Sequence, residues 1–220
     1  MEAAETVPRK SWPRLSLTAE RIRIWYQSPA GLVIFFSLYA TPIVLLLSGV
    51  IPRSYAHDLL FIFLPVMFVY GRIRRFSFLK LGFSPHWERG LRENIFFSLI
   101  AISGIATLYF VGILKDPQHM KDGHFFIFYV CFSCPAQAFL YLSIPFAELE
   151  RRGYGKNTYI WVSALNFCFL HAFFLDWPTL VVTFIMGLIW GWIYGKYQNF
   201  WGCAISHMVL GVLSIIVGLI

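Results

Sequence analysis

Two histidines and a glutamine lie inside long apolar segments, where polar and ionisable side chains are rare. His171 and His207 occupy two separate segments near the C-terminus, and Gln137 lies in a third segment, two residues after Pro135. Proline removes a backbone hydrogen bond from a helix, so we expect Pro135 to kink its segment and to free a carbonyl near Gln137. Because polar groups in hydrocarbon must find partners, we expect the three side chains to converge on a small polar cavity.

The two histidines determine which chemistry is open to such a cavity. Histidine acts as a general acid or base near neutral pH and also binds metals. Hydrolysis of a peptide bond within a membrane needs a base for water, a donor for the oxyanion and a path for water. His171 and His207 could supply the first two. A metal-site hydrolase with Cys168 or Cys203 as further ligands is another interpretation, but two histidines on separate helices are too few to specify zinc and no HExxH motif is present.

The carboxylates nearest to these residues in the sequence are Glu148 and Glu150. They follow Gln137 by 11 and 13 residues, which corresponds to roughly 16–20 Å along a helix. We therefore expect both to lie at the cytoplasmic surface as solvated charges, beside Arg151 and Arg152, and no carboxylate to lie at the depth of the histidines.

Hydropathy predicts the elements that carry these residues. The chain is 58% hydrophobic and only 13% charged, about half the charged fraction of a soluble domain, and its mean hydropathy is +0.65. A membrane helix needs roughly 20 mainly apolar residues. We therefore predict an all-α fold, a polytopic transmembrane helical bundle of about seven spans, at residues 31–51, 55–71, 94–114, 125–147, 158–175, 177–195 and 199–220. The short Asp176–Pro178 connection predicts that the fifth and sixth spans form a tight antiparallel hairpin.

The positions of lysine and arginine predict the orientation of the bundle. With seven spans, one side receives Arg53, Lys115 and Lys121, and the other receives the remaining fifteen: Arg9, Lys10, Arg14, Arg21, Arg23, Arg72, Arg74, Arg75, Lys80, Arg89, Arg92, Arg151, Arg152, Lys156 and Lys196. The positive-inside rule then places the N-terminus in the cytoplasm. The net charge of +7 is explained in this way without a nucleic-acid partner.

The chain is predicted to have one membrane domain. We expect residues 1–30 to form a basic cytoplasmic segment and residues 31–220 to form a single transmembrane domain, with the residues of chemical interest at 125–220. Arg21–Tyr26 is basic and aromatic, which is typical of an amphipathic element on the membrane surface. No cleavable signal peptide is evident.

Small residues in the spans are predicted to serve packing. Gly187, Gly191 and Gly195 recur at every fourth position, which favours close approach of a neighbouring helix. Cys131 and Cys134 have CxxC spacing, but in the middle of a membrane helix we expect them to be packed side chains and not a redox pair.

The order of motifs in residues 125–220 resembles the CPBP family of intramembrane proteases, which includes CAAX-processing and bacteriocin-processing enzymes and is also called the Abi family. Phe167-x-x-x-His171 matches the Phe-x-x-x-His motif of that family. His207-x-x-x-Gly211 matches the His of a His-x-x-x-Asn motif and has Gly where Asn is common. The Gly-rich sixth span and Asn199 before the last helix add to the resemblance.

The first motif of the family, Glu-Glu-x-x-x-Arg, is altered. Spacing back from His171 places Gln137 at its start, Ala138 at the expected Glu position and Leu142 at the expected Arg position. The alternative Glu148-x-x-x-Arg152 keeps both residue types, but it is close to His171 in the sequence and lies in a basic loop. We therefore favour the first alignment, which makes the chain an atypical member.

The resemblance implies an intramembrane endopeptidase in which a Glu at the Ala138 position and His171 activate water, while His207 and its neighbour stabilise the oxyanion. The implied substrate is a membrane-anchored peptide or protein, such as a sorting segment, a prenylated tail or a pheromone precursor, and no cofactor or metal is implied. With Ala138 as written, we expect little or no activity. The implied location is the bacterial cytoplasmic (inner) membrane. The alternatives are a non-catalytic membrane scaffold or chaperone of the same fold and, with less support, a transporter.

Overall fold

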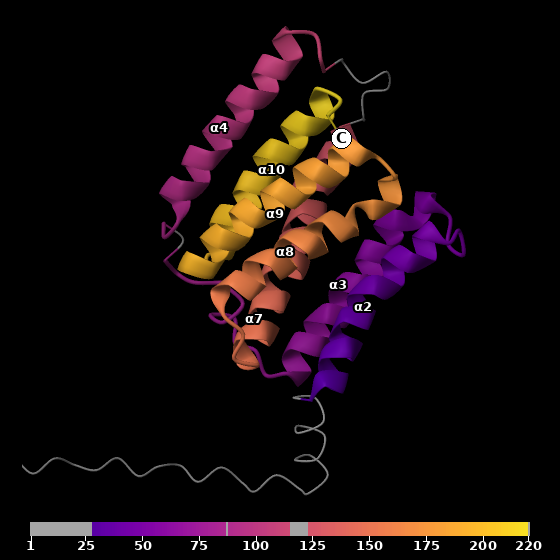
Figure 1. Cartoon of the computed structure of the whole chain (residues 1–220), viewed down its shortest axis with the longest axis vertical. Helices are drawn as coiled ribbons and strands as arrows, with labels where there is room; N and C mark the ends of the chain where they lie inside the picture. Colours follow the sequence, from indigo (N-terminus) through magenta and orange to yellow (C-terminus); the bar gives the residue numbers. More distant parts are fainter. Residues whose placement is uncertain (1–27, 87, 115–122, 220) are drawn as a thin grey trace, which may run out of the picture. The chain divides into compact units, whose positions relative to one another are not determined.

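The structure is a computed structural model that describes residues 28–86, 88–114 and 123–219. These residues form helices and connecting turns, with no strand among them (Figure 1). The prediction of an all-α membrane bundle is confirmed. The predicted surface element Arg21–Tyr26 and the residues Lys115 and Lys121 lie outside the described residues. By contacts, the chain divides into two units, residues 1–39 and 40–220, and all sites described below lie in the second unit.

Each predicted span contains helix in the described part of the chain. The long helices are α2 (Pro29–Leu47), α3 (Ala56–Ile73), α4 (Leu91–Phe110), α8 (Lys156–Leu170), α9 (Trp177–Tyr197) and α10 (Phe200–Ile216), and the fourth span is built from α5 (Gly123–Phe128), α6 (Cys134–Ala138) and α7 (Ile144–Arg151). Within the described residues, 5 helical stretches are long and apolar enough to cross a membrane: Pro29–Leu47, Arg53–Ile73, Leu91–Phe110, Gly123–Arg151 and Trp177–Tyr197. Helices α8 and α10 are shorter, with 15 and 17 residues.

The fourth span is one continuous helical stretch with two widened π-helical turns. These turns, at Tyr129–Ser133 and Phe139–Ser143, each end two residues before a proline, Pro135 and Pro145. Proline has no N–H, and its ring collides with the carbonyl four residues earlier, so a local change of hydrogen-bonding register relieves the clash. A π turn thus precedes Pro135, where the sequence predicted a kink, and the kink itself stays a prediction.

Helices α8 and α9 form the predicted antiparallel hairpin. Asp176 begins α9 as its N-cap, because its carboxylate accepts a hydrogen bond from the Thr179 backbone N–H at 2.9 Å. The predicted glycine face is also confirmed: a Cβ on Gly187 would lie 2.7 Å from the Ala164 Cα, and one on Gly191 would lie 3.1 Å from the Ser163 Cβ. The absence of side chains at these glycines of α9 therefore allows α8 to pack at close range.

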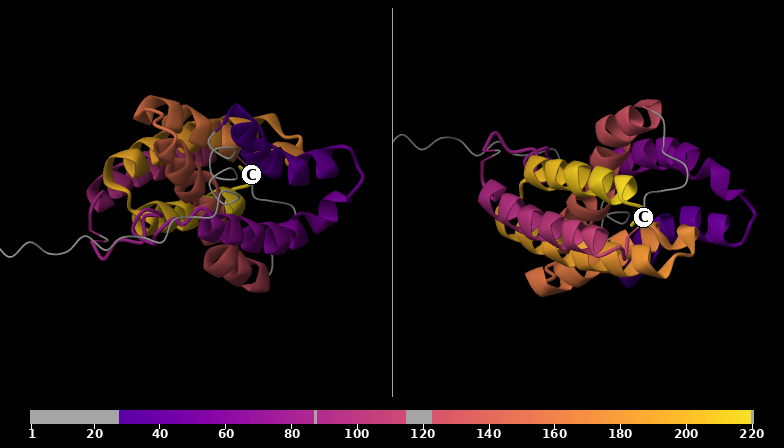
Figure 2. Two further views of the ribbon diagram at one scale, coloured as in Figure 1. Left: turned by 90° about the horizontal axis from the view of Figure 1, so that it is seen from below. Right: turned by 90° about the horizontal axis from the view of Figure 1, so that it is seen from above.

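Helix α10 packs between α4 and the distorted fourth span, and it also contacts α9. Its neighbour α4 runs beside it in Figure 1 and in the right-hand view of Figure 2. Asn199 caps the start of α10, where its side chain accepts from Gly202 N–H at 3.3 Å. This arrangement places His207 of α10 against α8, α9 and the fourth span.

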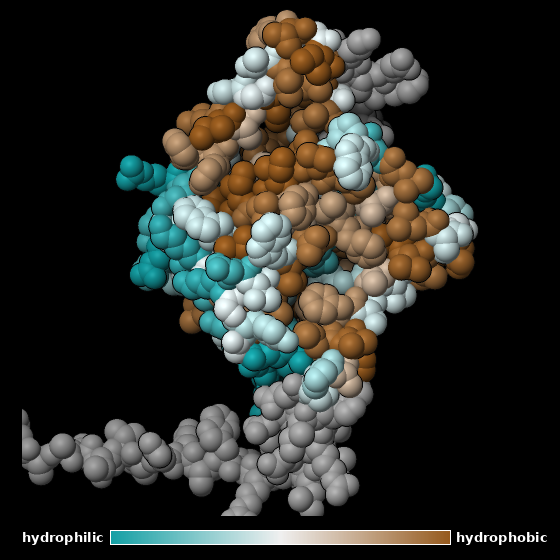
Figure 3. Space-filling model, viewed as in Figure 1, coloured by the Kyte–Doolittle hydropathy of each residue, from teal (hydrophilic) through white to brown (hydrophobic). Residues whose placement is uncertain are grey.

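The basic loops gather at one end of the second unit. The hydrophilic surface in Figure 3 lies on the side where α9 ends and where α4 and α10 begin. Ion pairs join segments there that are far apart in the sequence: Lys80 with Glu150 at 3.3 Å and Lys196 with Glu93 at 3.9 Å. Of the segments that the charge pattern assigned to the same side, those after the second, fourth and sixth spans are therefore together in space, whereas the orientation of that side toward the cytoplasm stays a prediction.

Candidate active site

A cavity of about 320 Å³ in the second unit brings Gln137 and His171 together. Four polar side chains of its lining come from the fourth span and the end of α8, Tyr129, Ser133, Gln137 and His171, and two more come from α3 and α9, His57 and Thr179. The rest of the lining is apolar and comes from the C-terminal half of α2, from α3 and from other helices and turns: Pro42, Ile43, Leu46, Ala56, Leu59, Leu60, Phe63, Phe125, Leu140, Leu170, Phe173, Phe174 and Ile215. An apolar cavity with a few convergent polar groups is the usual form of a ligand site.

His171 is held in one orientation at the end of α8. Its Nδ1 lies 2.8 Å from the carbonyl oxygen of Phe167, one helical turn earlier. Because a carbonyl can only accept, the neutral imidazole carries its proton on Nδ1 and keeps a lone pair on Nε2. The side chain is buried and lies on the cavity wall. This is the form that a general base needs.

Gln137 faces the same cavity and is hydrogen-bonded on one side only. Its Nε2 donates to the Ser133 hydroxyl at 2.9 Å. Its Oε1 is enclosed and finds no partner among the described residues. The neighbouring Ala138 is fully buried and is not part of the cavity lining that the described residues form. Of residues 137 and 138, it is therefore Gln137 that lines the cavity together with His171.

His207 lies behind the cavity wall in an aromatic enclosure. Its ring centroid is 5.0 Å from that of Trp190 and 5.2 Å from that of Phe167, and it also contacts Tyr129 and Tyr141. Trp190 is fixed in turn by a 2.9 Å hydrogen bond from its indole N–H to Ser206. His207 Nδ1 is buried, and the described residues offer it no hydrogen-bond partner. An unpaired buried nitrogen is costly and calls for a functional explanation.

The antiparallel packing of α8 against the fourth span explains why His171 and Gln137 line the same cavity. The Ser163 hydroxyl donates to the Tyr141 carbonyl at 3.1 Å, and the Phe167 ring stacks on the Tyr141 ring with centroids 4.1 Å apart. His171 follows Phe167 by four residues at the end of α8, and Gln137 precedes Tyr141 by four residues on the fourth span. Because the two helices run in opposite directions, these two steps lead the same way. The geometry is therefore consistent with the alignment that starts the first motif at Gln137.

Besides Ala138, two motif positions carry no polar side chain. Leu142, at the expected Arg position, is fully buried in apolar packing. Gly211, at the position where Asn is common, lies one turn after His207 on α10, and the Tyr129 hydroxyl lies against it. Tyr129 and Ser133 were missed by sequence reasoning, although their spacing with Gln137, four residues each, is the signal of a shared helix face.

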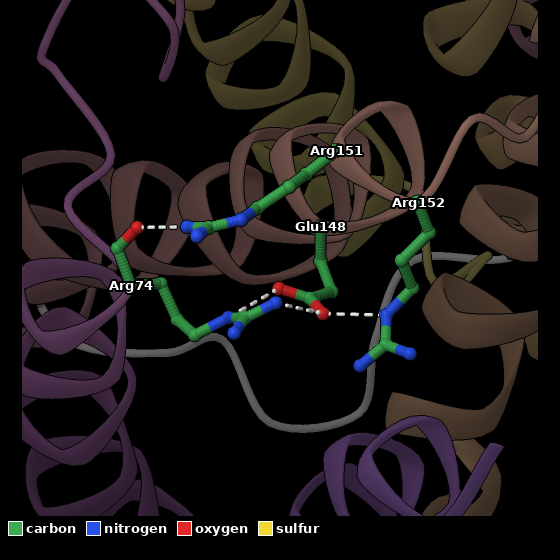
Figure 4. A network of polar contacts seen from close by, with 4 residues as sticks. All are labelled: Arg74, Glu148, Arg151 and Arg152. Carbon is green, nitrogen blue, oxygen red and sulfur yellow. Dashed lines mark hydrogen bonds and ion pairs between the residues drawn. The ribbon is translucent and has the colours of Figure 1, made fainter. Parts of the chain in front are cut away.

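Glu148 is not a solvated charge, and the sequence-based expectation for it is wrong. Its carboxylate is fully buried and accepts two hydrogen bonds from Arg74, at 3.0 and 2.9 Å, and one from Arg152 at 2.6 Å (Figure 4). Arg151 donates to the Arg74 carbonyl in the same cluster. Arg74 follows the end of α3, far away in sequence. Its positive charge compensates the cost of burying the Glu148 carboxylate. Glu150 is about half exposed, at 48%, as expected.

The Glu148-x-x-x-Arg152 pair therefore ties α3 to α7 at the polar end of the unit. Glu148 lies 11 residues beyond Gln137 on the same helical stretch, which is about 16 Å along the helix axis. The residues lining the cavity include neither partner. This cluster therefore lies apart from the cavity that His171 lines.

The cysteines are free thiols. Cys131 is exposed and Cys134 is buried, and neither is in a disulfide. Across the described ranges, no group of three or more His, Cys, Asp or Glu residues lies close enough together to hold a metal ion.

Comparison with known proteins shows a similarity in the C-terminal part of the chain. Residues 121–213 match the family described as "Type II CAAX prenyl endopeptidase Rce1-like". No curated protein and no solved structure gives a significant match. The matched range contains Gln137, His171, His207 and Gly211, all of which the motifs had singled out. This part of the chain is therefore similar to the CAAX-type protease family, and the resemblance predicted from its motifs is confirmed.

Proposed function

We propose that this protein is an intramembrane endopeptidase of the CPBP type whose catalytic centre is the cavity between Gln137 and His171. The single observation that carries the proposal is the geometry of His171, which has Nδ1 committed to the Phe167 carbonyl and its ring on the wall of a largely apolar cavity. The family match supports a CAAX protease-type activity. The substrate class, the residue roles and the level of activity are parts of the proposal.

The proposed reaction is hydrolysis of a peptide bond. His171 Nε2 takes a proton from water while the water oxygen bonds to the carbonyl carbon, and the π electrons of the carbonyl move to its oxygen. His207, behind the cavity wall, is the residue proposed to stabilise this oxyanion. The intermediate then collapses, the C–N bond breaks, and the proton passes from His171 to the leaving amine. One water and one peptide bond give a carboxylic acid and an amine, so the reaction balances without a cofactor.

We propose that the substrate is a membrane-anchored chain with an apolar tail. The cavity lining is dominated by aliphatic and aromatic side chains such as Leu46, Leu60, Phe63 and Phe125, which would contact a prenyl chain or an apolar sorting segment. Burial of such a tail supplies binding energy in proportion to the area removed from water. A lipid-embedded peptide or protein is therefore the proposed partner.

We further propose that activity is low in the chain as written. No Asp or Glu is found among the described residues that line the cavity. Gln137 has the shape of glutamate and lies on the cavity wall, but an amide cannot share a proton with water as a carboxylate does. His171 then acts alone on the water.

The test is cleavage of membrane-tethered fluorogenic peptides in proteoliposomes, with prenylated and non-prenylated apolar tails. We expect Gln137→Glu to raise kcat/KM at least tenfold over the unchanged protein, and His171→Ala added to that variant to remove the gain. Ala138→Glu is the matched control and should give no gain, since Ala138 is buried outside the cavity lining of the described residues.

Three outcomes would contradict parts of this proposal. A gain in kcat/KM for Ala138→Glu, with none for Gln137→Glu, would place the catalytic carboxylate at residue 138. Full cleavage after His171→Ala would exclude His171 as the base. No cleavage in any variant would reject the protease and favour the second candidate, a non-catalytic membrane scaffold or chaperone, which the carboxylate-free cavity also supports.

A further inference from the structure

The hydroxyl of Tyr129 occupies the space where residue 211 would carry a side chain. A Cβ built on Gly211 would overlap the Tyr129 hydroxyl oxygen and would lie 2.9 Å from both Cε1 and Cζ of that ring. Real Cβ contacts do not approach this closely, so Tyr129 in its present position requires glycine at 211. The two residues come from different helices, η2 (Tyr129–Ser133) in the fourth span and α10.

Tyr129 is oriented by its surroundings. Its ring stacks on Phe125 with centroids 5.9 Å apart and an interplanar angle of 17°, and it meets the His207 ring edge-to-face at 6.4 Å. It is the first residue of the first π turn, which shifts the helical register just before the residues that face the cavity. The side chain is buried but belongs to the cavity lining together with Gln137 and His171.

The Tyr129 hydroxyl lies next to His207 on the α10 face. Gly211 follows His207 by four residues, so the two positions are neighbours on one side of that helix. The interaction partner of the hydroxyl is the thiol of Cys134, and sulfur is a weak acceptor that gives up a donor at little cost. The O–H can therefore turn toward a stronger acceptor, such as an oxyanion, in the cavity.

We infer that the Tyr129 hydroxyl is the second hydrogen-bond donor of the oxyanion site, acting beside His207 in place of a side chain at residue 211. When water adds to the scissile carbonyl and the π electrons move to oxygen, the phenol O–H donates to that oxygen and its proton stays on Tyr129. Glycine at 211 is then part of the site, because it makes room for the donor. This inference rests on the proposed function.

Tyr141 provides a matched control. Its hydroxyl is also buried near His207, with ring centroids 6.1 Å apart, and it has no hydrogen-bond partner within the described part of the chain. It differs from Tyr129 in that the cavity lining does not include it. A donor role that depends on the cavity therefore predicts a loss for Tyr129→Phe and none for Tyr141→Phe.

The experiment measures kcat and KM in the Gln137→Glu background with the tethered peptide. Removal of one oxyanion donor typically costs about 10²–10³ in kcat, so Tyr129→Phe should lower kcat by that factor and change KM less than about threefold. Gly211→Asn alone should be inactive because its side chain displaces Tyr129. Tyr129→Ala with Gly211→Asn should recover at least tenfold over Tyr129→Ala, because the new amide fills the vacated space as a donor.

A binding measurement separates this inference from the proposed function. A peptide phosphonate carries a tetrahedral anionic group, and its affinity relative to the matching uncleaved amide can be measured by calorimetry without turnover. The unchanged protein should prefer the phosphonate, and Tyr129→Phe should lose that preference by about 10²-fold. If Gln137→Glu does not cleave, the protease proposal fails, while this binding result still decides the role of Tyr129.

Equal kcat for Tyr129→Phe and its parent in an active background would overturn the donor role and leave the protease proposal intact. A loss confined to Tyr141→Phe would assign the donor to that residue instead. Equal phosphonate preference in Tyr129→Phe and the unchanged protein, or no preference in either, would also overturn it.

Discussion

The hydroxyl of Ser163 donates to the carbonyl of Tyr141, four residues before Pro145. This is the carbonyl that a normal helix would bond to residue 145, and proline has no N–H to offer. The serine on α8 therefore satisfies an acceptor that the fourth span cannot satisfy in the usual way. The same hydrogen bond fixes the register between α8 and the fourth span in which His171 and Gln137 line one cavity.

Ser163→Ala should destabilise the protein by about 1–3 kcal/mol, because the variant leaves a buried acceptor without its side-chain donor. Thermal unfolding in detergent measures the effect. Ser103→Ala is the matched control: Ser103 also donates to a backbone carbonyl, that of Leu99, but from an exposed position. Equal melting temperatures for both variants would contradict the role assigned to Ser163.

Gly187→Ala should cost about 1–3 kcal/mol through overpacking, since the added Cβ would meet the backbone of Ala164 on α8 at 2.7 Å. Backbone atoms cannot turn aside as a flexible side chain does. Gly104→Ala in α4 is the control, because no heavy atom lies within 4 Å of its added Cβ, and it should change stability by less than about 1 kcal/mol. The measurement is the unfolding midpoint, and a tolerated Gly187→Ala would mean that α8 and α9 are further apart.

Glu148→Ala should destabilise strongly, by about 3–5 kcal/mol, because it leaves Arg74 and Arg152 buried without their carboxylate. Glu150→Ala removes a partly exposed partner of Lys80 and should cost less than about 1 kcal/mol. The yield of folded protein after detergent extraction and its unfolding midpoint compare the two. If Glu148→Ala folded normally but abolished cleavage, the cluster would be catalytic and not structural.

The predicted orientation can be tested with single cysteines at the two ends of the α8–α9 hairpin. Tyr154 is 45% exposed and Trp177 is 74% exposed. A membrane-impermeant maleimide should label Tyr154→Cys only from the cytoplasmic side and Trp177→Cys only from the opposite side, as the positive-inside rule predicts. The unchanged protein supplies the background labelling of the native cysteines. The reverse labelling pattern would show that the bundle has the opposite orientation in the membrane.

Several features were determined by the sequence alone. Apolar segments of sufficient length predicted the helices, because in lipid each backbone polar group must be satisfied within its own segment. The four-residue spacing of Gly187, Gly191 and Gly195 predicted a packing face, and the face is present. The motifs around His171 and His207 predicted the family. All of these depend on local spacing along one helix.

Other features depend on contacts between segments distant in sequence, and only the tertiary structure decided them. Glu148 is buried because Arg74, 74 residues away, reaches it from α3. Gln137, and not Ala138, lines the cavity, in a stretch of the fourth span that has a π turn on each side. Tyr129 lies over Gly211 because α10 packs against that span. Spacing within one helix cannot reveal such pairs, since the partner that satisfies a buried polar group comes from another helix.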